Sequence, residues 1–182
     1  EKGLNLAEIE TRLTELQNSK AENPEEYWVN ATYPEIIDHI LVRYHQRHRE
    51  QLQELIVLAD RVESVHGDRE DCPIGVAAEL RNVYEDLSNH MMKEEHVLFP
   101  MIKAGNYMMA QMPIRMMEME HAEHGEHLDV LKSLTNNMTP PADACNTWRA
   151  LYSGIQEFAD DLMMHIHREN NILFPRVIAE NH

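Results

Sequence analysis

The chain of 182 residues has few residues of several types, and each shortage argues against a class of protein. It has 6 glycines, and its two cysteines, Cys72 and Cys145, lie far apart and form no C-x-x-C pair. Two isolated cysteines exclude a disulfide framework and a cysteine-based zinc site, and they fit a reducing compartment. So few glycines, with prolines mostly near expected helix ends, favour long helices joined by short turns.

Basic residues are scarce as well: 16 Lys and Arg stand against 32 Asp and Glu, a formal net charge of −16. This balance argues against nucleic acid and anionic membranes as partners, since both attract basic patches. The longest stretch without a charged side chain, residues 104–114, is much shorter than the roughly 20 apolar residues of a membrane-spanning helix. The N-terminus shows neither a signal peptide nor an initiator Met, so we expect a cytoplasmic protein and interpret the chain as a fragment or a processed product.

Hydrophobic periodicity predicts an all-α protein, with a short N-terminal helix followed by an up-down-up-down bundle of four long helices. The short helix follows the capping-box sequence Asn5–Glu8 and leads into a connector over residues 21–26. We expect residues 1–30 to form this N-terminal helix and linker, and residues 31–182 to form the bundle.

The bundle helices carry apolar stripes in steps of three and four residues. Pro34 lies in the first turn of the first helix, the second helix is expected to start near Pro73, and the third is expected to open at Pro113. The stripes include Leu41 on the first helix and Met101 on the second.

An internal repeat is the most informative feature of the sequence. The segment His90–Pro100 recurs as His165–Pro175, and both follow the pattern H-x3-E-x3-L-F-P. A weaker repeat relates the first and third helices, where His45-x2-His48 corresponds to His121-x2-His124. The chain therefore reads as one helix pair used twice, with pseudo-twofold symmetry.

In both copies of the pattern, His and Glu lie four residues apart and share the apolar face of a helix. An isolated carboxylate in a bundle core costs several kcal/mol or takes up a proton, so a bound metal explains two such pairs best. Histidine and glutamate without thiolates favour iron or manganese over structural zinc. Spacing alone does not choose between His45 and His48, or between His121 and His124, as the ligands of the other two helices.

Several other residues are expected to play no part in metal binding. Glu95 lies off the apolar stripe, so its loss should change little. The methionines between residues 108 and 119 are expected to fill the core. Six further histidines are expected to be solvated or supporting: His39, His66, His96, His127, His167 and His182.

The repeated pattern, with His on the first and third helices, resembles the hemerythrin-like di-iron proteins, and most closely the repair of iron centres family, the iron–sulfur cluster repair di-iron proteins. Segments Ile37–Glu50, Ser88–Glu95 and Asn136–Pro141 are similar to that family, and the similarity covers roughly residues 34–178. The resemblance implies two non-haem irons, bridged by oxo or hydroxo and by the two glutamates, and the ligands His45, His90, Glu94, His121, His165 and Glu169. It leaves His48, His124 and Glu120 to orient ligands or move protons, and it implies no other cofactor site.

The same resemblance implies a protein of the nitrosative and oxidative stress response. Its partners would be proteins with damaged iron–sulfur clusters, which it would repair most simply by donating iron from a labile centre. Two other functions stay open: an enzyme that reduces nitric oxide at the di-iron site, and a binding protein or sensor for oxygen or nitric oxide. Catalytic residues and the oligomeric state are not predicted.

The sequence departs from its relatives in two ways. Full-length family members carry a small N-terminal domain with adjacent cysteines, which this chain lacks. We therefore do not expect this chain alone to perform the thiol chemistry or the partner contacts of that domain. Oxygen-carrying hemerythrins use a further His four residues after the helix-three ligand, where this chain has Gly125. We therefore expect both irons to be open to small ligands such as nitric oxide.

Overall fold

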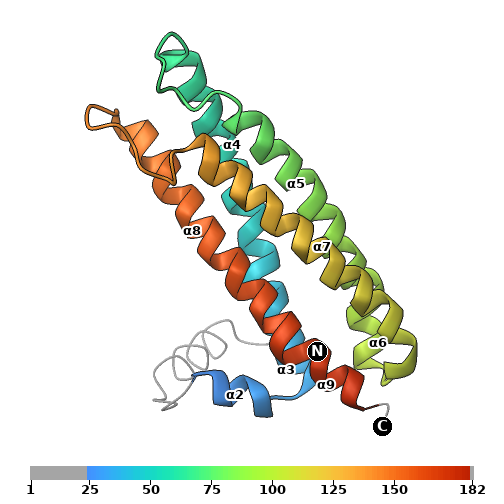
Figure 1. Cartoon of the computed structure of the whole chain (residues 1–182). Helices are drawn as coiled ribbons and strands as arrows, with labels where there is room; N and C mark the ends of the chain where they lie inside the picture. The colour runs from blue at the N-terminus through green and yellow to red at the C-terminus, as the bar shows by residue number, and fades with distance from the viewer. Residues whose placement is uncertain (1–23, 181–182) are drawn as a thin grey trace, which may run out of the picture. The chain divides into compact units, whose positions relative to one another are not determined.

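The computed structural model describes residues 24–180, and all regular structure within them is helical (Figure 1). The chain divides into two units between Thr32 and Tyr33. The described part of the first unit is the short helix α2 (Pro24–Asn30). The sequence predicts a connector over residues 21–26, and this is wrong from Pro24 onward, because proline is well tolerated in the first turn of a helix. The short helix predicted after Asn5 lies outside the described residues.

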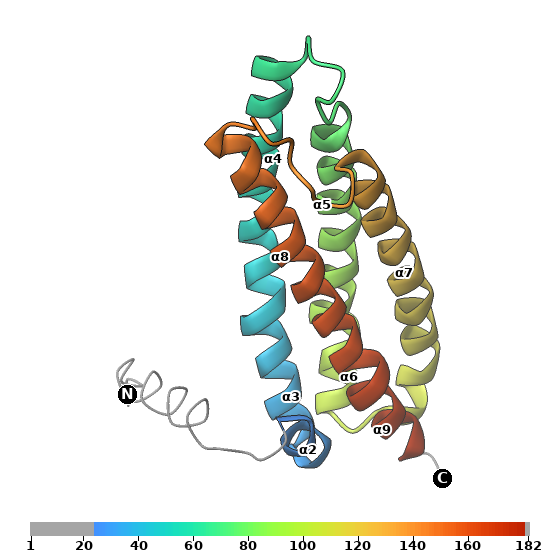
Figure 2. The same cartoon turned by 60° about the vertical axis from the view of Figure 1, so that its left-hand side comes forward.

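The second unit is the predicted up-down-up-down bundle, seen from two sides in Figures 1 and 2. It consists of four helical rods, three of which contain a short π-helical segment (η). The first rod comprises α3 (Tyr33–Ile40), η1 (Leu41–His45) and α4 (Gln46–His66); the second comprises α5 (Val76–Lys93), η2 (Glu94–Leu98) and α6 (Phe99–Lys103); the third is α7 (Tyr107–Leu134); and the fourth comprises α8 (Asn146–Arg168), η3 (Glu169–Leu173) and α9 (Phe174–Ala179).

Consecutive rods pack side by side, and the first also packs against the fourth, so the four rods enclose a common interior. α4 contacts both α5 and α8, while α7 contacts α5 and α9. The apolar core includes Leu52, Leu80, Leu87, Leu128 and Leu162, all at most 2% exposed. Among the described helices, none is long and apolar enough to cross a membrane.

Two of the predicted helix starts are wrong by several residues. The second rod begins at Val76, because the preceding Gly75 has a φ of 100°, a left-handed conformation that ends the turn before the helix. The third rod begins at Tyr107 and carries Pro113 in its interior. Proline removes one backbone hydrogen bond there, but the buried residues Ala110 and Ile114 on either side hold the segment against the bundle.

The three π-helical segments shift the buried stripes. A π turn holds one extra residue, so the side chains beyond it rotate relative to an uninterrupted α-helix. The stripe of the first rod therefore buries Ile40 instead of the predicted Leu41, and the stripe of the second buries Ile102 instead of the predicted Met101. An α-helical period cannot anticipate this change of register.

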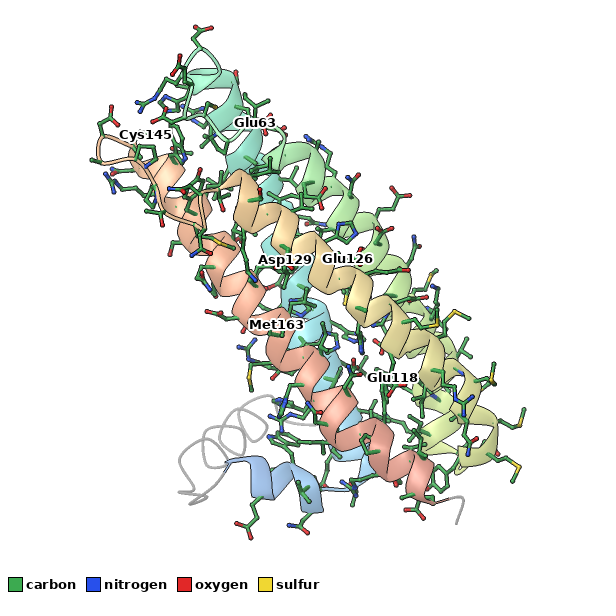
Figure 3. The ribbon with its side chains drawn as sticks, in the orientation of Figure 1. Glu63, Glu118, Glu126, Asp129, Cys145 and Met163 are labelled. Carbon is green, nitrogen blue, oxygen red and sulfur yellow. The ribbon has the colours of Figure 1, made fainter. Side chains whose placement is uncertain are left out.

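Most methionines of α7 are exposed, so the prediction that they fill the core is wrong. Met117 is buried, but the others on this stretch are between 55% and 75% exposed: Met108, Met109, Met112, Met116 and Met119. Figure 3 shows sulfur atoms projecting from the outer side of the helix near α6. The buried face of α7 is already filled by Ile114, Met117 and the two inward histidines, which leaves these methionines on the solvent face.

Candidate metal centre

The six side chains singled out as ligands lie deep inside the bundle, each at most 5% exposed. His45 ends η1 on the first rod, and His121 lies midway along α7. The two H-x3-E patterns straddle the junctions between α-helix and π-helix. In each, the histidine lies in the last turn of the α-helix and the glutamate is the first residue of the π segment, as in the pair His90 and Glu94 and the pair His165 and Glu169.

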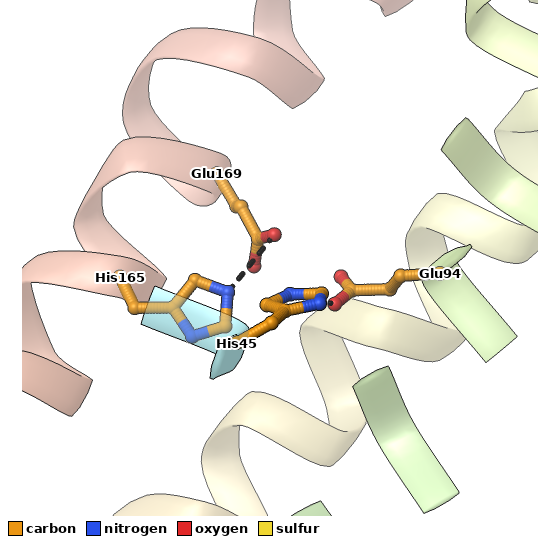
Figure 4. Close-up of side chains that lie close together, drawn as sticks. All are labelled: His45, Glu94, His165 and Glu169. Carbon is orange, nitrogen blue, oxygen red and sulfur yellow. Dashed lines mark ion pairs between the residues drawn. The ribbon is translucent and has the colours of Figure 1, made fainter. Parts of the chain in front are cut away.

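These side chains form two groups of four possible donors, with both glutamates in each group. We name them position A (His45, Glu94, His165 and Glu169) and position B (His90, Glu94, His121 and Glu169). Within each group, one donor atom per residue lies within 4.8 Å of all the others. Figure 4 shows position A, with the carboxylates and the imidazoles turned toward a common centre. Each position takes one histidine from each copy of the helix pair.

The distances between neighbouring donors suit metal coordination. At position A, His45 Nε2 lies 3.2 Å from a Glu94 oxygen, and His165 Nε2 lies 3.2 Å from a Glu169 oxygen. At position B, the corresponding distances are 3.1 Å from His121 to Glu169 and 3.5 Å from His90 to Glu94. Neighbouring ligands of an octahedral ion with bonds of about 2.1 Å are separated by about 3 Å. Glu169 uses a different oxygen toward each position, as a bridging carboxylate does.

The buried donor atoms lack ordinary hydrogen-bond partners. Within residues 24–180, no hydrogen bond reaches either carboxylate oxygen of Glu94 or Glu169, nor the Nε2 atoms of His45 and His165. Buried polar atoms are normally paired, and an exception calls for an explanation such as an ion. The donors present therefore fit a pair of cations.

Hydrogen bonds on the far side of three imidazole rings fix which nitrogen faces the centre. The Nδ1 atom of His45 lies 2.8 Å from Glu95, that of His90 2.9 Å from Glu120, and that of His121 2.8 Å from the side-chain oxygen of Asn170. These oxygens only accept, so each Nδ1 carries the proton. The Nε2 atoms of His90 and His121 then face each other at 3.1 Å, and a cation or a proton must lie between them.

Comparison with known proteins identifies the family. The Hemerythrin HHE cation binding domain model matches residues 36–177. A probable iron–sulfur cluster repair protein from Haemophilus influenzae is 68% identical over 99% of this chain and 81% of that protein. The iron–sulfur cluster repair proteins YtfE of Musicola paradisiaca and Escherichia coli are 56% and 55% identical; the matches cover 96% and 98% of this chain and 78% and 80% of those proteins. The chain belongs to the hemerythrin-like family of iron–sulfur cluster repair proteins.

The electrostatics of this hemerythrin-like centre are those of a site that is short of positive charge. Burial, together with the neighbouring Glu169 carboxylate, raises the pKa of Glu94 to about 8. Burial also acts to raise the pKa of Glu169, but the imidazoles of His165 and His121 hold it well below its ordinary value. A divalent cation would replace the proton on Glu94 and neutralise both carboxylates.

The phenylalanines of the repeated pattern pack on the ligands of the neighbouring rods. Phe99 stacks on His45 with ring centroids 5.7 Å apart, and Phe174 stacks on His121 at 6.0 Å. The two contacts are related by the pseudo-twofold symmetry. They account for the shared spacing between Glu and Phe in the two copies: the pattern places an apolar ring against a buried histidine of the neighbouring rod.

Two residues that contact ligands were not predicted from the sequence. Glu95 was expected to lie away from the site, so that its loss would change little; the structure shows that it accepts hydrogen bonds from His45 and Arg49, and these contacts lower its pKa to about 2. Asn170 is its counterpart in the second copy of the pattern. Both directly follow the glutamate of an H-x3-E pattern, and this shared place in the repeat is the signal that could have found them.

Glu120, predicted as a supporting residue, contacts the ligand His90 and the ammonium of Lys93. His48 and His124 are buried, with their rings 5.3 Å from His165 and 4.9 Å from His90, but no donor atom of either belongs to position A or B. Of the histidines expected to be solvated or supporting, His127 bridges carboxylates on α5, and His182 lies outside the described residues.

Proposed function

We propose that this chain binds two iron ions, one at position A and one at position B, and that it repairs damaged iron–sulfur clusters by supplying iron. The proposed ligands are His45, His90, Glu94, His121, His165 and Glu169. The arrangement of two buried carboxylates shared between two pairs of imidazoles is the observation that carries the proposal. The family supports the repair function, because its curated members are named for it.

The donor set favours iron over other metals. Four imidazoles and two carboxylates offer nitrogen and oxygen but no thiolate, whereas structural zinc is usually held in a closed tetrahedral site. Two cations bridged by two carboxylates would lie about 3.5 Å apart, the usual spacing in two-metal sites, with an oxo or hydroxo group completing the bridge. Iron held by these residues would supply a metal that can be either ferrous or ferric.

The residues around the centre would hold the two iron ions without filling every coordination place on them. Each position offers two imidazole nitrogens and two carboxylate oxygens, so an octahedral ion keeps places for solvent or for a ligand from an acceptor. Phe99 and Phe174 limit the access of water, and Glu95, Glu120 and Asn170 hold three rings in place. Ferrous iron carries less charge than ferric iron and should leave this carboxylate pair more easily.

Small gases are further proposed ligands, and the cytoplasm is the proposed location. At Gly125 a β-carbon would meet no atom within 4 Å, so the third histidine of the oxygen carriers is replaced by open space. We propose that nitric oxide and oxygen bind at the metal positions, where no third histidine competes with them. The free thiols Cys72 and Cys145 fit a reducing compartment.

Recovery of a dehydratase whose [4Fe–4S] cluster has been damaged with peroxide tests this function. The iron-loaded chain, with a thiol reductant as the electron source, should restore activity, and the restored activity should match the iron that the chain loses. The chain loaded in the same way after Glu169→Gln should hold fewer than two irons and restore correspondingly less activity. Loss of nitric oxide on repeated turnover, without any recovery of the dehydratase, would instead favour a nitric oxide reductase. Purification with one tightly bound zinc per chain would contradict the proposal.

A further inference from the structure

The two metal positions are supported unequally, although the ligands that form them are related by symmetry. At position B, both histidines are held at Nδ1, His90 by Glu120 and His121 by Asn170. At position A, His45 alone is held in this way among the described residues, by Glu95. The Nδ1 atom of His165 is fully buried, and within residues 24–180 no hydrogen bond reaches it.

Stacking replaces the missing hydrogen bond of His165. Its ring lies parallel to that of Tyr44, with centroids 5.3 Å apart and an angle of 7° between the planes. Tyr44 directly precedes the ligand His45, as Glu120 directly precedes His121, so the two rods place an aromatic ring and a carboxylate at equivalent points. A ring stack restricts the plane of His165 but does not strengthen Nε2 as a ligand, which a hydrogen bond at Nδ1 does.

A second difference lies one turn farther along the first rod, at His48. Its side chain is fully buried, its ring lies 5.3 Å from that of His165, and its Nε2 atom has no hydrogen-bond partner within residues 24–180. Its other nitrogen, Nδ1, lies 3.3 Å from the side-chain oxygen of Gln51. The Gln51 amide in turn donates to Asp161 at 2.9 Å.

The direction of these hydrogen bonds sets the state of His48. Because the amide nitrogen of Gln51 faces the acceptor Asp161, its oxygen must face His48, and Nδ1 of His48 carries the proton. Nε2 is then left with its lone pair and is able to bind a cation. Asp161 continues the row of ligands outward, because its second oxygen lies 2.6 Å from Arg43, whose side chain is 47% exposed.

Beside position B, the corresponding row is interrupted within the described residues. His124 corresponds to His48, but neither of its ring nitrogens has a hydrogen-bond partner within the described residues. His127 corresponds to Gln51 and contacts Asp86, which lies at the place of Asp161 in the repeat, as well as Glu79, but within the described residues no hydrogen bond joins His127 to His124. A row of donors from the centre to the surface is thus built beside position A alone, as far as residues 24–180 show.

We propose that the iron at position A is the one the protein gives up, that the iron at position B is retained, and that His48 Nε2 is the first ligand on the way out, followed by the Asp161 carboxylate. This inference rests on the proposed function and specifies which of the two ions is the cargo. Release would be a ligand exchange, in which the ion loses its bonds to His165 and to the carboxylate oxygens as it gains one to His48 Nε2. No electron is transferred, and no covalent bond of the chain is broken.

Iron release from the reduced, fully loaded chain to a ferrous chelator tests the proposal. Two phases of equal amplitude are expected, each one iron per chain. His48→Phe should slow the fast phase at least 10-fold and keep two irons per chain, whereas the matched variant His124→Phe, which alters a residue beside His90 at position B, should leave the fast phase unchanged. Asn170→Leu should accelerate the slow phase about 10–100-fold and leave the fast phase unchanged, since loss of such a partner weakens metal binding by about that factor. If His48→Phe fails to fold, His48→Gln replaces it.

The location of the remaining ion decides the assignment. Crystals grown after the fast phase should show anomalous scattering from iron between His90 and His121 and none between His45 and His165. Iron remaining between His45 and His165, equal depletion of both positions, single-phase release, or equal slowing by His124→Phe would each overturn the inference while leaving cluster repair intact. A chain that holds two irons but restores no damaged cluster would overturn the proposed function instead, and a chain that binds no iron would overturn both.

Discussion

At the scale of single residues, Glu94 and Glu169 set the chemistry of the molecule. Both side chains are 0% exposed, and they lie close enough to share two sets of donors. Two ionised carboxylates in a dry interior oppose folding unless a cation or a proton compensates them. The two carboxylates therefore lower the free energy of unfolding of the metal-free chain, and a cation bound between them would restore it.

Replacing one of these carboxylates by its amide should separate metal binding from stability. Glu94→Gln should lower iron from two per chain to one or fewer, because a bridging ligand is lost. At pH 9, above the pKa of about 8 of Glu94, the same change should stabilise the metal-free protein by about 1–3 kcal/mol, since it removes one of two buried charges. At pH 6 the proton on Glu94 already neutralises it, so the gain should shrink.

Metal analysis and urea unfolding at the two pH values check this prediction. Glu118→Gln is the matched control, because Glu118 is exposed on the outer side of α7 (Figure 3). It should change neither the iron content nor the pH dependence. Two irons per chain in Glu94→Gln, or a loss of stability at pH 9, would contradict the bridging role.

At the scale of elements, the helices could be predicted from the sequence better than their internal register. The period of apolar residues predicted the four rods, and the repeated pattern predicted the six buried donor residues that lie together in the bundle. The π turns at Leu41–His45, Glu94–Leu98 and Glu169–Leu173 were not predictable from that period, because it assumes an α-helical turn throughout and does not allow for an inserted residue. The contact of Glu95 with His45 and the exposure of the α7 methionines were not predicted either. Residue type and spacing do not reveal which neighbouring element covers a given face of a helix.

Between α5 and α7, His127 should stabilise the packing in a pH-dependent way. Its ring nitrogens lie 2.6 Å from Glu79 and 3.1 Å from Asp86. Burial alone lowers the pKa of His127, but these hydrogen bonds outweigh it and raise the pKa above its ordinary value. A histidine whose pKa is higher in the folded state adds stability below its unfolded pKa and loses that contribution as the pH rises through its folded pKa.

His127→Gln should therefore destabilise the metal-free protein by roughly 0.5–1 kcal/mol at pH 5.5 and by much less at pH 9. Urea unfolding at both values measures the difference, with His96→Gln, on the exposed side of η2, as the control. A destabilisation that is the same at both pH values would assign His127 a packing role without charge.

The exposed methionines of α7 should be the first residues to react with peroxide. Thioether oxidation to the sulfoxide follows exposure, and Met108, Met109, Met112, Met116 and Met119 are all more than half exposed while Met91 and Met117 are buried. Peptide mass mapping after brief treatment should find sulfoxide at the first group while the second stays reduced and the iron stays bound. Early oxidation of Met91 would mean that the bundle opens near the centre under these conditions.

At the scale of the whole molecule, the metal centre joins the two copies of the helix pair. His45 and His90 come from the first copy, and His121 and His165 from the second, yet each metal position takes one histidine from each copy. Neither copy alone offers a complete position. A metal ion bound at either position would therefore hold the two halves together, and the duplication accounts for the donor groups as well as for the fold.

This pairing predicts different outcomes for two double variants that each lose two histidines. His45→Ala with His165→Ala removes both imidazoles of position A and leaves position B complete, so one iron per chain should remain. His45→Ala with His90→Ala removes one imidazole from each position, so neither should hold iron through a desalting column, because each position keeps a single nitrogen ligand. Metal analysis gives the stoichiometry, and Mössbauer spectra should show a single iron species in the first variant. One iron per chain in the second variant and none in the first would mean that the positions are formed within each copy, with His45 paired to His90, and the centre would have to be redrawn.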